Sequence, residues 1–356
     1  LLGAAVGALM VTMFLVQAGR IGTVEGEPYV VGFPTTGRLN VMLAQGDGQA
    51  FAALATDPSL SRPEQFVGQT ADTRVGVEAA YRAQRPVLGY LVWATSFGQP
   101  ELVKPALVVW QVIGAGAAVG VVAHLLASRG AARPELALLV LVHPGAVQAI
   151  SWLGPELLGV ALAFGGWALV GRRFGWAVAV LCLAGLVKES LLLFPAVLGL
   201  GLLLRRDLLR AVVMGIPFVV YGAWVAVVHQ RFDAWPGEAN EGRLGPPLDG
   251  FLEALDGLST IELVIVAVGF GVAVLAWRYR ADPLAWLVWA TTGLGLLAGW
   301  DVWNRLAINR TLLPAHIAIG VLLLTGVHDP YDRGRAARGA DRRDRVGEVD
   351  GVVPAG

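Results

Sequence analysis

Long apolar runs bounded by arginines recur along this 356-residue chain and constrain its fold more than any other feature. A helix that crosses a bilayer needs about 20 apolar residues, because the hydrocarbon core is about 30 Å thick. Seven runs satisfy this criterion, and three shorter runs are bracketed by charges. The seven are 1–19, 106–128, 135–152, 209–228, 257–277, 284–300 and 311–327, and the three are 156–170, 174–187 and 191–204.

The composition agrees with this pattern. Hydrophobic residues make up 56% of the chain and charged residues 15%, which is far more apolar than a soluble domain. The formal net charge of zero gives no support for nucleic-acid binding. The single cysteine, Cys182, lies within an apolar run, so a disulfide framework and a thiol metal site are both excluded. The sequence predicts a polytopic all-α membrane protein.

The positions of Lys and Arg predict the topology, because short cytoplasmic loops carry an excess of positive charge. If every arginine cluster faces the cytoplasm, the chain crosses out and back between consecutive clusters. We therefore expect about ten transmembrane helices in a domain spanning 1–328, followed by a cytoplasmic disordered tail, 329–356. Residues 1–19 are expected to be the first helix and not a signal peptide. The clusters are Arg129 and Arg133, Arg172 and Arg173, Arg205, Arg206 and Arg210, and Arg278 and Arg280.

Two extracytoplasmic segments are long. Residues 20–105 form the first outer loop, which is expected to contain short helices. Residues 229–256 form the second, whose Pro, Gly and acids are typical of a structured but non-helical loop. Within the first, the run from Pro86 to Phe97 is too short to span comfortably. We expect it to be re-entrant or interfacial, with an eleventh span as the alternative.

Polar residues that a plain helix bundle does not need map to the outer face of this topology, and they define the candidate site. They are Asp47, Tyr81, Arg82 and Arg85 in the first outer loop, Glu156, Lys188, Glu189 and Ser190 at turns, and Asp301, Asn304, Arg305 and Arg310 near the last helix.

The pair Lys188 and Glu189 joins two helices of about 14 residues, or about 21 Å each, which is shorter than the hydrocarbon core. The turn is therefore expected to lie below the outer headgroups. Ionisable groups at that depth are costly, and they line a cavity or pair with one another. The alternative is a self-paired hairpin turn close to water.

Arg305 and Arg310 break the positive-inside pattern in a short outer loop. Their forked donors match the oxygens of a phosphate. The alternative is simple anchoring, in which the side chains extend to lipid phosphates. Arg82 and Arg85, which precede the short apolar run, permit the same two interpretations.

Asp47 lies between two glycines, which give the backbone freedom. It is either the N-cap of a helix that begins near Gln49 or a general base that accepts a proton from a hydroxyl. His143 precedes Pro144 and is expected to cap or kink the third helix. The five histidines show no metal-ligand spacing, and no nucleotide loop or hydrolase motif appears.

Five stretches together carry a family resemblance: "QGDGQAFAALATDP", "YRAQRPVLGYLVWA", "GPELLGVALAF", "AGLVKESLLLFPAVLGLGLLLRR" and "NRLAINRTLLPAHIAIGVLLL". With the first helix and the large outer loop, they resemble bacterial GT-C glycosyltransferases. The chain is similar in particular to the mannosyltransferase-like branch that builds cell-surface glycopolymers. The resemblance runs from residue 1 to about residue 327 and consists of short motifs, none of which is diagnostic alone.

The resemblance implies a GT-C-like enzyme of the bacterial plasma membrane. Its active face is extracytoplasmic, and it takes a sugar from a polyprenyl-phosphate donor to a glycan or glycolipid acceptor. Asp47 matches the acid that acts as catalytic base in this class. A single acid in place of a pair weakens the case for a metal and leaves a divalent-metal requirement open. The implied donor-phosphate ligands are Arg82, Arg85, Lys188, Arg305 and Arg310, and the implied sugar or acceptor ligands are Tyr81, Glu156, Glu189 and Asp301.

Two other classes remain as alternatives. A multi-pass transporter or flippase of a lipid-linked or anionic substrate would also place Lys and Glu within the membrane. Transporters usually contain paired broken helices in an internal repeat, and this sequence shows no repeat. A non-enzymatic assembly subunit would fit the topology, but it would not explain the grouped acid and arginines.

Overall fold

Helices account for all the regular structure in the part of the chain that the computed structural model describes. The described residues are 1–22, 36–44, 46–62, 75–240, 244–258, 260–299, 302–303, 308–328 and 331. Within them the chain forms no β-strand, and an isolated bridge joins Leu244 to Ala298. The predicted all-α class is therefore confirmed for these residues, whereas nearly all of the predicted tail, 329–356, lies outside them.

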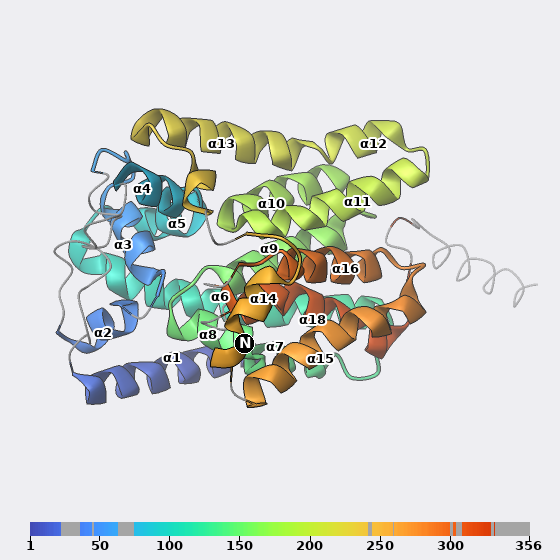
Figure 1. Cartoon of the computed structure of the whole chain (residues 1–356), viewed down its shortest axis with the longest axis horizontal. Helices are drawn as coiled ribbons and strands as arrows, with labels where there is room; N and C mark the ends of the chain where they lie inside the picture. The colour runs from blue at the N-terminus through green and yellow to red at the C-terminus, as the bar shows by residue number, and fades with distance from the viewer. Residues whose placement is uncertain are drawn as a thin grey trace, which may run out of the picture.

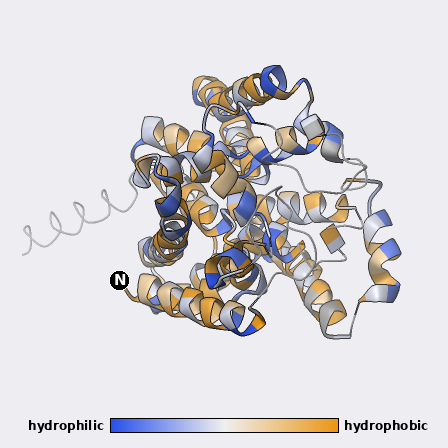
Figure 2. Ribbon diagram, turned by 90° about the vertical axis from the view of Figure 1, so that its left-hand side faces the viewer, coloured by the Kyte–Doolittle hydropathy of each residue, from blue (hydrophilic) through white to orange (hydrophobic). Residues whose placement is uncertain are grey.

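Among the described residues, four helices are long and apolar enough to cross a membrane. They are α1 (Leu2–Ile21), α6 (Pro100–Ser128), α18 (Ile308–Thr325) and the run Leu208–Phe232, which comprises α12 (Leu208–Val213) and α13 (Ile216–Phe232). Their outward side chains include large apolar groups exposed on the protein surface, such as Met13, Val109 and Val219. Such a surface is stable only against lipid or another apolar partner. The chain is thus a helical membrane protein, and Figure 2 shows apolar residues along most of its helical ribbon.

The predicted span 135–152 is broken in the middle. A segment made of η2 (Pro134–Leu138) and α7 (Leu139–Val142) meets α8 (Pro144–Ser151) at 59°. Pro144 lacks a backbone N–H and forces the residue before it out of the helical region, so His143 is extended, with φ −64° and ψ 133°. The Nδ1 atom of His143 accepts a hydrogen bond from the Gly145 N–H at 3.0 Å. His143 therefore both bends the predicted span and caps α8, as expected.

The remaining predicted spans are shorter helices. They are α9 (Glu156–Leu169), α10 (Phe174–Val187), α11 (Leu193–Leu204) preceded by η3 (Glu189–Leu192), α15 (Thr260–Ala276) and α16 (Pro283–Leu296). At 1.5 Å per residue, the 14-residue helices α9 and α10 are about 21 Å long. Every apolar run predicted to span is therefore helical, while ten complete crossings remain a prediction.

The core lies where α9 packs between α6 and α10. Phe164 and Trp167 of α9 and Phe194 of α11 are buried there, and Phe194 meets both rings edge to face at 5.0 and 6.0 Å. On one side α1 packs along α6, and on the other α16 pairs with α18. This packing fixes α9, α10 and α18, whose ends carry the candidate site.

Short helices gather at one end of the bundle, and Figure 1 shows them beside the C-terminal end of α1. They are α2 (Arg38–Ala44), α3 (Gly48–Thr56), α4 (Val75–Ala83) and α5 (Pro86–Thr95). Only ten residues long, α5 packs its buried Leu88 and Val92 against the bundle. The helix is too short to cross a bilayer, in line with the re-entrant interpretation. The turns that carry the predicted cytoplasmic arginines lie toward the opposite end (Figure 1).

The second outer segment corrects one expectation. Residues 229–256 are not free of helix, because they contain the end of α13, the turns η4 (Pro236–Asn240) and η5 (Leu255–Gly257), and the short helix α14 (Asp249–Ala254). Gly250 explains how α14 packs: a Cβ there would lie 2.5 Å from the Ala298 carbonyl oxygen. Only glycine permits this approach of α14 to the end of α16.

A buried ion pair ties the opposite end together. Arg129 at the end of α6 contacts Asp282 at 2.9 Å, and their side chains are 1% and 0% exposed. Asp282 also caps α16 by accepting from the Leu284 N–H at 2.9 Å, and it accepts from the His328 N–H at 2.8 Å. One carboxylate thus connects the ends of α6, α16 and α18.

Candidate functional site

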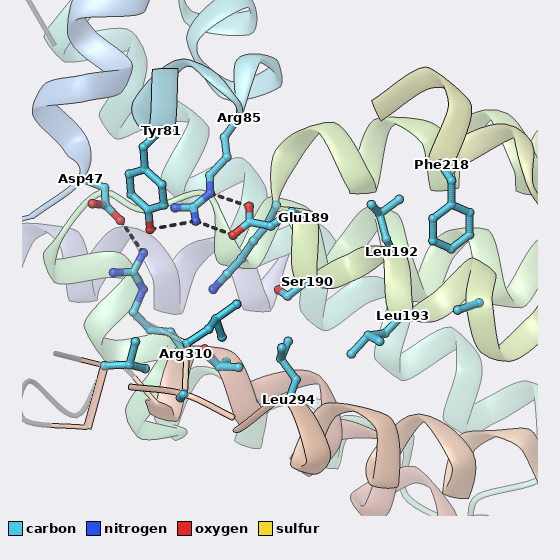
Figure 3. A pocket seen from close by; sticks show the side chains of 16 residues that line it. Asp47, Tyr81, Arg85, Glu189, Ser190, Leu192, Leu193, Phe218, Leu294 and Arg310 are labelled. Carbon is cyan, nitrogen blue, oxygen red and sulfur yellow. Dashed lines mark hydrogen bonds and ion pairs between the residues drawn. The ribbon is translucent and has the colours of Figure 1, made fainter. Parts of the chain in front are cut away.

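A cavity of about 390 Å³ lies at the end of the bundle where the short helices gather. Its lining changes character from one end to the other, as Figure 3 shows. Charged and phenolic side chains line one end, and apolar side chains from η3, α11, α13 and α16 line the other. The polar end contains Asp47, Tyr81, Arg85, Lys188, Glu189 and Arg310, and the apolar end contains Leu192, Leu193, Ala196, Phe218 and Leu294.

Two glycines place Asp47 at this cavity, but not by giving the backbone freedom. Neither Gly46 nor Gly48 has a positive φ. A Cβ on Gly46 would lie 2.6 Å from the Trp152 Cβ, and one on Gly48 would lie 2.8 Å from a Leu43 methyl group. The Gly48 N–H also donates to the Trp152 carbonyl at 3.1 Å. The glycines therefore permit close packing, which holds Asp47 in a fixed position.

The carboxylate of Asp47 is bound by two arginines from distant parts of the chain. Arg82 of α4 reaches Oδ1 through Nη1 at 2.6 Å, and Arg310 of α18 reaches Oδ2 through Nη2 at 2.9 Å. Asp47 stands at the N-cap position of α3, but its side chain makes no capping hydrogen bond. An N-cap role alone is therefore wrong, since the carboxylate is directed to the guanidinium groups instead.

Arg310 lies in the first turn of α18, and not in the loop where it was expected. Its guanidinium stands over the Trp152 ring at 5.0 Å and binds the carboxylate of Glu156 through Nε at 2.7 Å and through Nη2. Glu156 also accepts from Lys188 Nζ at 3.3 Å. With a side chain only 2% exposed, Glu156 lies behind the two cations and does not line the cavity. A sugar could reach Glu156 only by displacing Arg310 or Lys188.

The Lys188–Glu189 turn is not self-paired. Lys188 ends α10 in an extended conformation, with φ −158° and ψ 125°, so neighbouring side chains diverge there. Lys188 turns to Glu156, whereas Glu189 binds Arg85 through two bonds, Nε–Oε2 at 2.8 Å and Nη2–Oε1 at 2.6 Å. The Arg85 guanidinium also donates to the Tyr81 hydroxyl at 3.3 Å. The turn therefore connects to α9 on one side and to the first outer loop on the other.

The charges at the cavity leave a positive excess. Among its lining residues Arg85, Lys188 and Arg310 carry three positive charges, and Asp47 and Glu189 carry two negative charges. Burial alone would lower the pKa of Arg85, but Glu189, Tyr81 and Asp47 together outweigh burial and raise that pKa well above its usual value. Burial lowers the pKa of Lys188, and the Glu156 carboxylate only partly opposes that effect. The lining is therefore suited to an anion.

Two contacts that could not be predicted from the sequence hold the segment that carries Arg82 and Arg85 in place. The Tyr221 hydroxyl donates to Gln84 Oε1 at 2.9 Å, and Trp224 Nε1 donates to the Ala83 carbonyl at 3.0 Å. Both aromatic residues belong to α13, where a sequence pattern cannot tell them from ordinary interfacial Tyr and Trp. Thr311, which lines the cavity beside Arg310, was also missed.

Seven of the candidate residues thus line one cavity, and Arg82 and Glu156 lie directly behind its lining. Asp301, Asn304 and Arg305 lie outside the described residues. Over the described ranges, no group of three or more His, Cys, Asp or Glu is arranged to hold a metal ion. No protein-family model, curated protein or solved structure matches the chain.

Proposed function

We propose that the protein is a membrane glycosyltransferase that transfers a sugar from a polyprenyl-phosphate donor to an extracytoplasmic glycan or glycolipid acceptor. The observation that carries this proposal is one cavity that joins a cationic end, with the carboxylate of Asp47, to an apolar end. A phosphate with an isoprenoid tail has the same two-part character. The GT-C-like fold and the ten crossings belong to this proposal.

Arg310 and Lys188 are the groups best placed to hold the donor phosphate. Both line the cavity, and Glu156 neutralises both from behind. The 3.3 Å contact of Lys188 is longer than the 2.7–2.9 Å typical of charge-assisted hydrogen bonds. The ammonium has three donors, so it can turn toward a phosphate without leaving Glu156. Arg85 is held in a bidentate pair with Glu189, so it lies beside the proposed phosphate site and does not bind the phosphate directly.

The isoprenoid tail would follow the apolar end of the cavity. Leu192 and Leu193 line this end, together with Phe218 of α13 and Leu294 of α16 (Figure 3). Phe218 is 42% exposed on the protein surface. A tail in this part of the cavity would lie beside Phe218, and we propose that it leaves toward the lipid there, so that the donor loads from within the membrane.

In the proposed reaction, Asp47 accepts the proton of an acceptor hydroxyl. The hydroxyl oxygen forms a bond to the anomeric carbon of the donor sugar from the side opposite the phosphate. The bond between that carbon and the phosphate oxygen breaks, and its electron pair leaves with the polyprenyl phosphate. Arg310 and Lys188 stabilise the charge that develops on the leaving phosphate, as fixed cations do in a site shielded from water. The sugar is transferred with inversion.

The ion pairs of Asp47 suggest how the base becomes active. Without substrate, Asp47 is neutralised by Arg82 and Arg310 together. A donor phosphate would compete with Asp47 for Arg310, which faces the cavity. Arg82 does not line the cavity and would keep the carboxylate in place. Donor binding would then free one Asp47 oxygen to accept the proton.

Asp47→Asn tests the proposal in purified, membrane-reconstituted protein. With a panel of polyprenyl-phosphate sugars, the variant should bind polyprenyl phosphate as the native protein does, yet transfer sugar at least about 100-fold more slowly. The matched control is Asp249→Asn, which changes an exposed acid of α14. Near-normal transfer by Asp47→Asn would remove it from the mechanism. Movement of the labelled lipid across the bilayer without sugar transfer would favour a flippase instead.

A further inference from the structure

Two turns that carry arginines meet at the end of the bundle opposite the charged cavity. Glu156 begins α9 and Lys188 follows α10 at the cavity, so the α9–α10 turn lies at the other end, as does the C-terminal end of α11 (Figure 1). Arg210 of α12 joins the two turns, because its guanidinium lies 5.5 Å from the centre of the Phe174 ring at the start of α10. The arginines are Arg172 and Arg173 between α9 and α10, and Arg205, Arg206 and Arg210 after α11.

The chain supplies little negative charge to balance these arginines. Asp207 contacts Arg210 at 3.4 Å. Arg172, Arg173 and Arg206 are exposed, and none of the three forms an ion pair in the described part of the chain. We call Arg172, Arg173, Arg206 and Arg210 the arginine surface. One acid opposes four cations there, so the surface attracts an anion.

Arg206 holds a backbone conformation that favours glycine. Its φ is 60°, in the left-handed region, and the next N–H, of Asp207, donates to the Leu202 carbonyl at 3.0 Å. This bond closes the C-terminal end of α11, and glycine is preferred at such a position because a Cβ crowds the carbonyl oxygen. The strain at Arg206 therefore indicates that its side chain has a function at the surface. Three other helices, α1, α6 and α18, are followed by glycines of positive φ, which are Gly22, Gly130 and Gly326.

Exposed apolar side chains adjoin the arginine surface. The helix α12 buries none of its residues, and Leu209 and Val212 are 77% and 74% exposed. On α10, Trp176 follows Phe174 by two residues and is 67% exposed. Apolar groups so exposed are stable only against lipid or another apolar partner, and Trp is typical of the headgroup level. The arginines therefore lie where lipid headgroups meet acyl chains.

We propose that the arginine surface binds the headgroup of an anionic phospholipid whose acyl chains lie against Leu209, Val212 and Trp176. The phosphodiester oxygens accept from guanidinium groups and supply the missing negative charge. The exposed apolar side chains favour a lipid over a free anion, which would leave them uncovered. This binding is independent of the reaction proposed at the charged cavity, which lies at the other end of α9, α10 and α11.

The test is thermal unfolding of the purified full chain in detergent micelles that contain phosphatidylglycerol or phosphatidylcholine with the same acyl chains. Phosphatidylglycerol should raise Tm progressively with its mole fraction, because a ligand of the folded state stabilises that state. Phosphatidylcholine should raise Tm less, and inorganic phosphate should not reproduce the rise. Equal effects of the two lipids, no rise with phosphatidylglycerol, or a full rise with inorganic phosphate would overturn the proposal.

Arg206→Gly separates lipid binding from folding. The substitution removes the guanidinium and relieves the left-handed backbone, so Tm without lipid should stay the same or rise. The double variant Arg173→Gln, Arg206→Gly should nevertheless lose at least half of the rise caused by phosphatidylglycerol. The matched control is Arg278→Gln, which changes an exposed arginine between α15 and α16 and should keep the full rise. A full rise in the double variant, or an equal loss in the control, would contradict the assignment to the arginine surface.

Discussion

Glu156→Gln gives the sharpest test of the charge arrangement around the cavity. The substitution keeps the size of the side chain and an accepting oxygen, but it removes the negative charge that faces Arg310 and Lys188. All three side chains are nearly buried, at 2%, 7% and 11% exposed for Glu156, Arg310 and Lys188. Water cannot replace the lost charge. The variant therefore leaves two cations with only Asp47 as an opposing charge on Arg310.

Removing one partner of a buried ion pair usually costs about 3–5 kcal/mol. We expect about 3 kcal/mol here, the lower end of that range, because Asp47 remains bound to Arg310 and Lys188 can lose its proton. An unfolding entropy of about 2.1 cal/mol/K per residue gives about 0.7 kcal/mol/K for a chain of this length. Glu156→Gln should therefore lower Tm by about 4 °C.

Thermal unfolding of the purified protein measures this effect, with Glu101→Gln as the control. Glu101 is an exposed acid in the first turn of α6, and its substitution should shift Tm by less than about 1 °C. Adding Lys188→Met to Glu156→Gln removes the cation that has lost its carboxylate partner and should recover part of the loss, since substitutions of contacting residues are not additive. A Tm for Glu156→Gln equal to that of the native protein would refute the assignment of Glu156 as the buried counter-charge.

Three further outcomes follow from other contacts. Asp282→Ala leaves the Arg129 guanidinium buried without its carboxylate and should lower the free energy of unfolding by about 3–5 kcal/mol, measured as a fall in Tm. The double variant Asp282→Ala, Arg129→Met should recover part of that fall. Gly46→Ala places a methyl group 2.6 Å from the Trp152 side chain and should lower the free energy of unfolding by about 1–3 kcal/mol. It should also lower sugar transfer, and unchanged transfer would show that the loop has room to adjust. Burial lowers the pKa of Lys188 in the folded protein below its ordinary value of about 10.4 in the unfolded chain. At a pH between these two pKa values the folded protein binds fewer protons than the unfolded chain, so stability rises with pH. Lys188→Met should flatten this rise in Tm measured from pH 7 to pH 10, and an unchanged slope would assign it to another group.

The helices were largely predictable because the information that sets them is local. The run predicted over 174–187 is α10 with the same limits, and the bend at His143 follows from the proline after it. The start of the last helix was less accurate. A hydropathy pattern excludes arginine, so the predicted run began at 311, whereas Arg is a good helix former and α18 begins at Ile308. Its charge is acceptable there because two carboxylates neutralise it.

The partners of the site residues were not predictable in the same way. Lys188 and Glu189 are adjacent in sequence, and their pairing with each other was the alternative interpretation of the turn. Their actual partners are Glu156, 32 residues away, and Arg85, 104 residues away from Glu189. Only the packing of α9 and α4–α5 around the α10–η3 turn brings these groups together. The sequence could identify which residues gather at one end of the bundle, but not which cation meets which carboxylate.

The length of α9 and α10 bears both on the number of membrane crossings and on the form of the site. The helices α9 and α10 are about 21 Å long, about 9 Å less than a hydrocarbon core, so their ends cannot reach both surfaces of a bilayer if they lie upright. Those ends carry Glu156, Lys188 and Glu189, and the outer-loop residues Asp47 and Arg85 descend to meet them. A recess of this kind permits charged groups to pair below the surface and to remain open to a lipid from the side. The short length of α9 and α10 is therefore the same property that, under the proposed function, would create a place for a lipid-linked substrate.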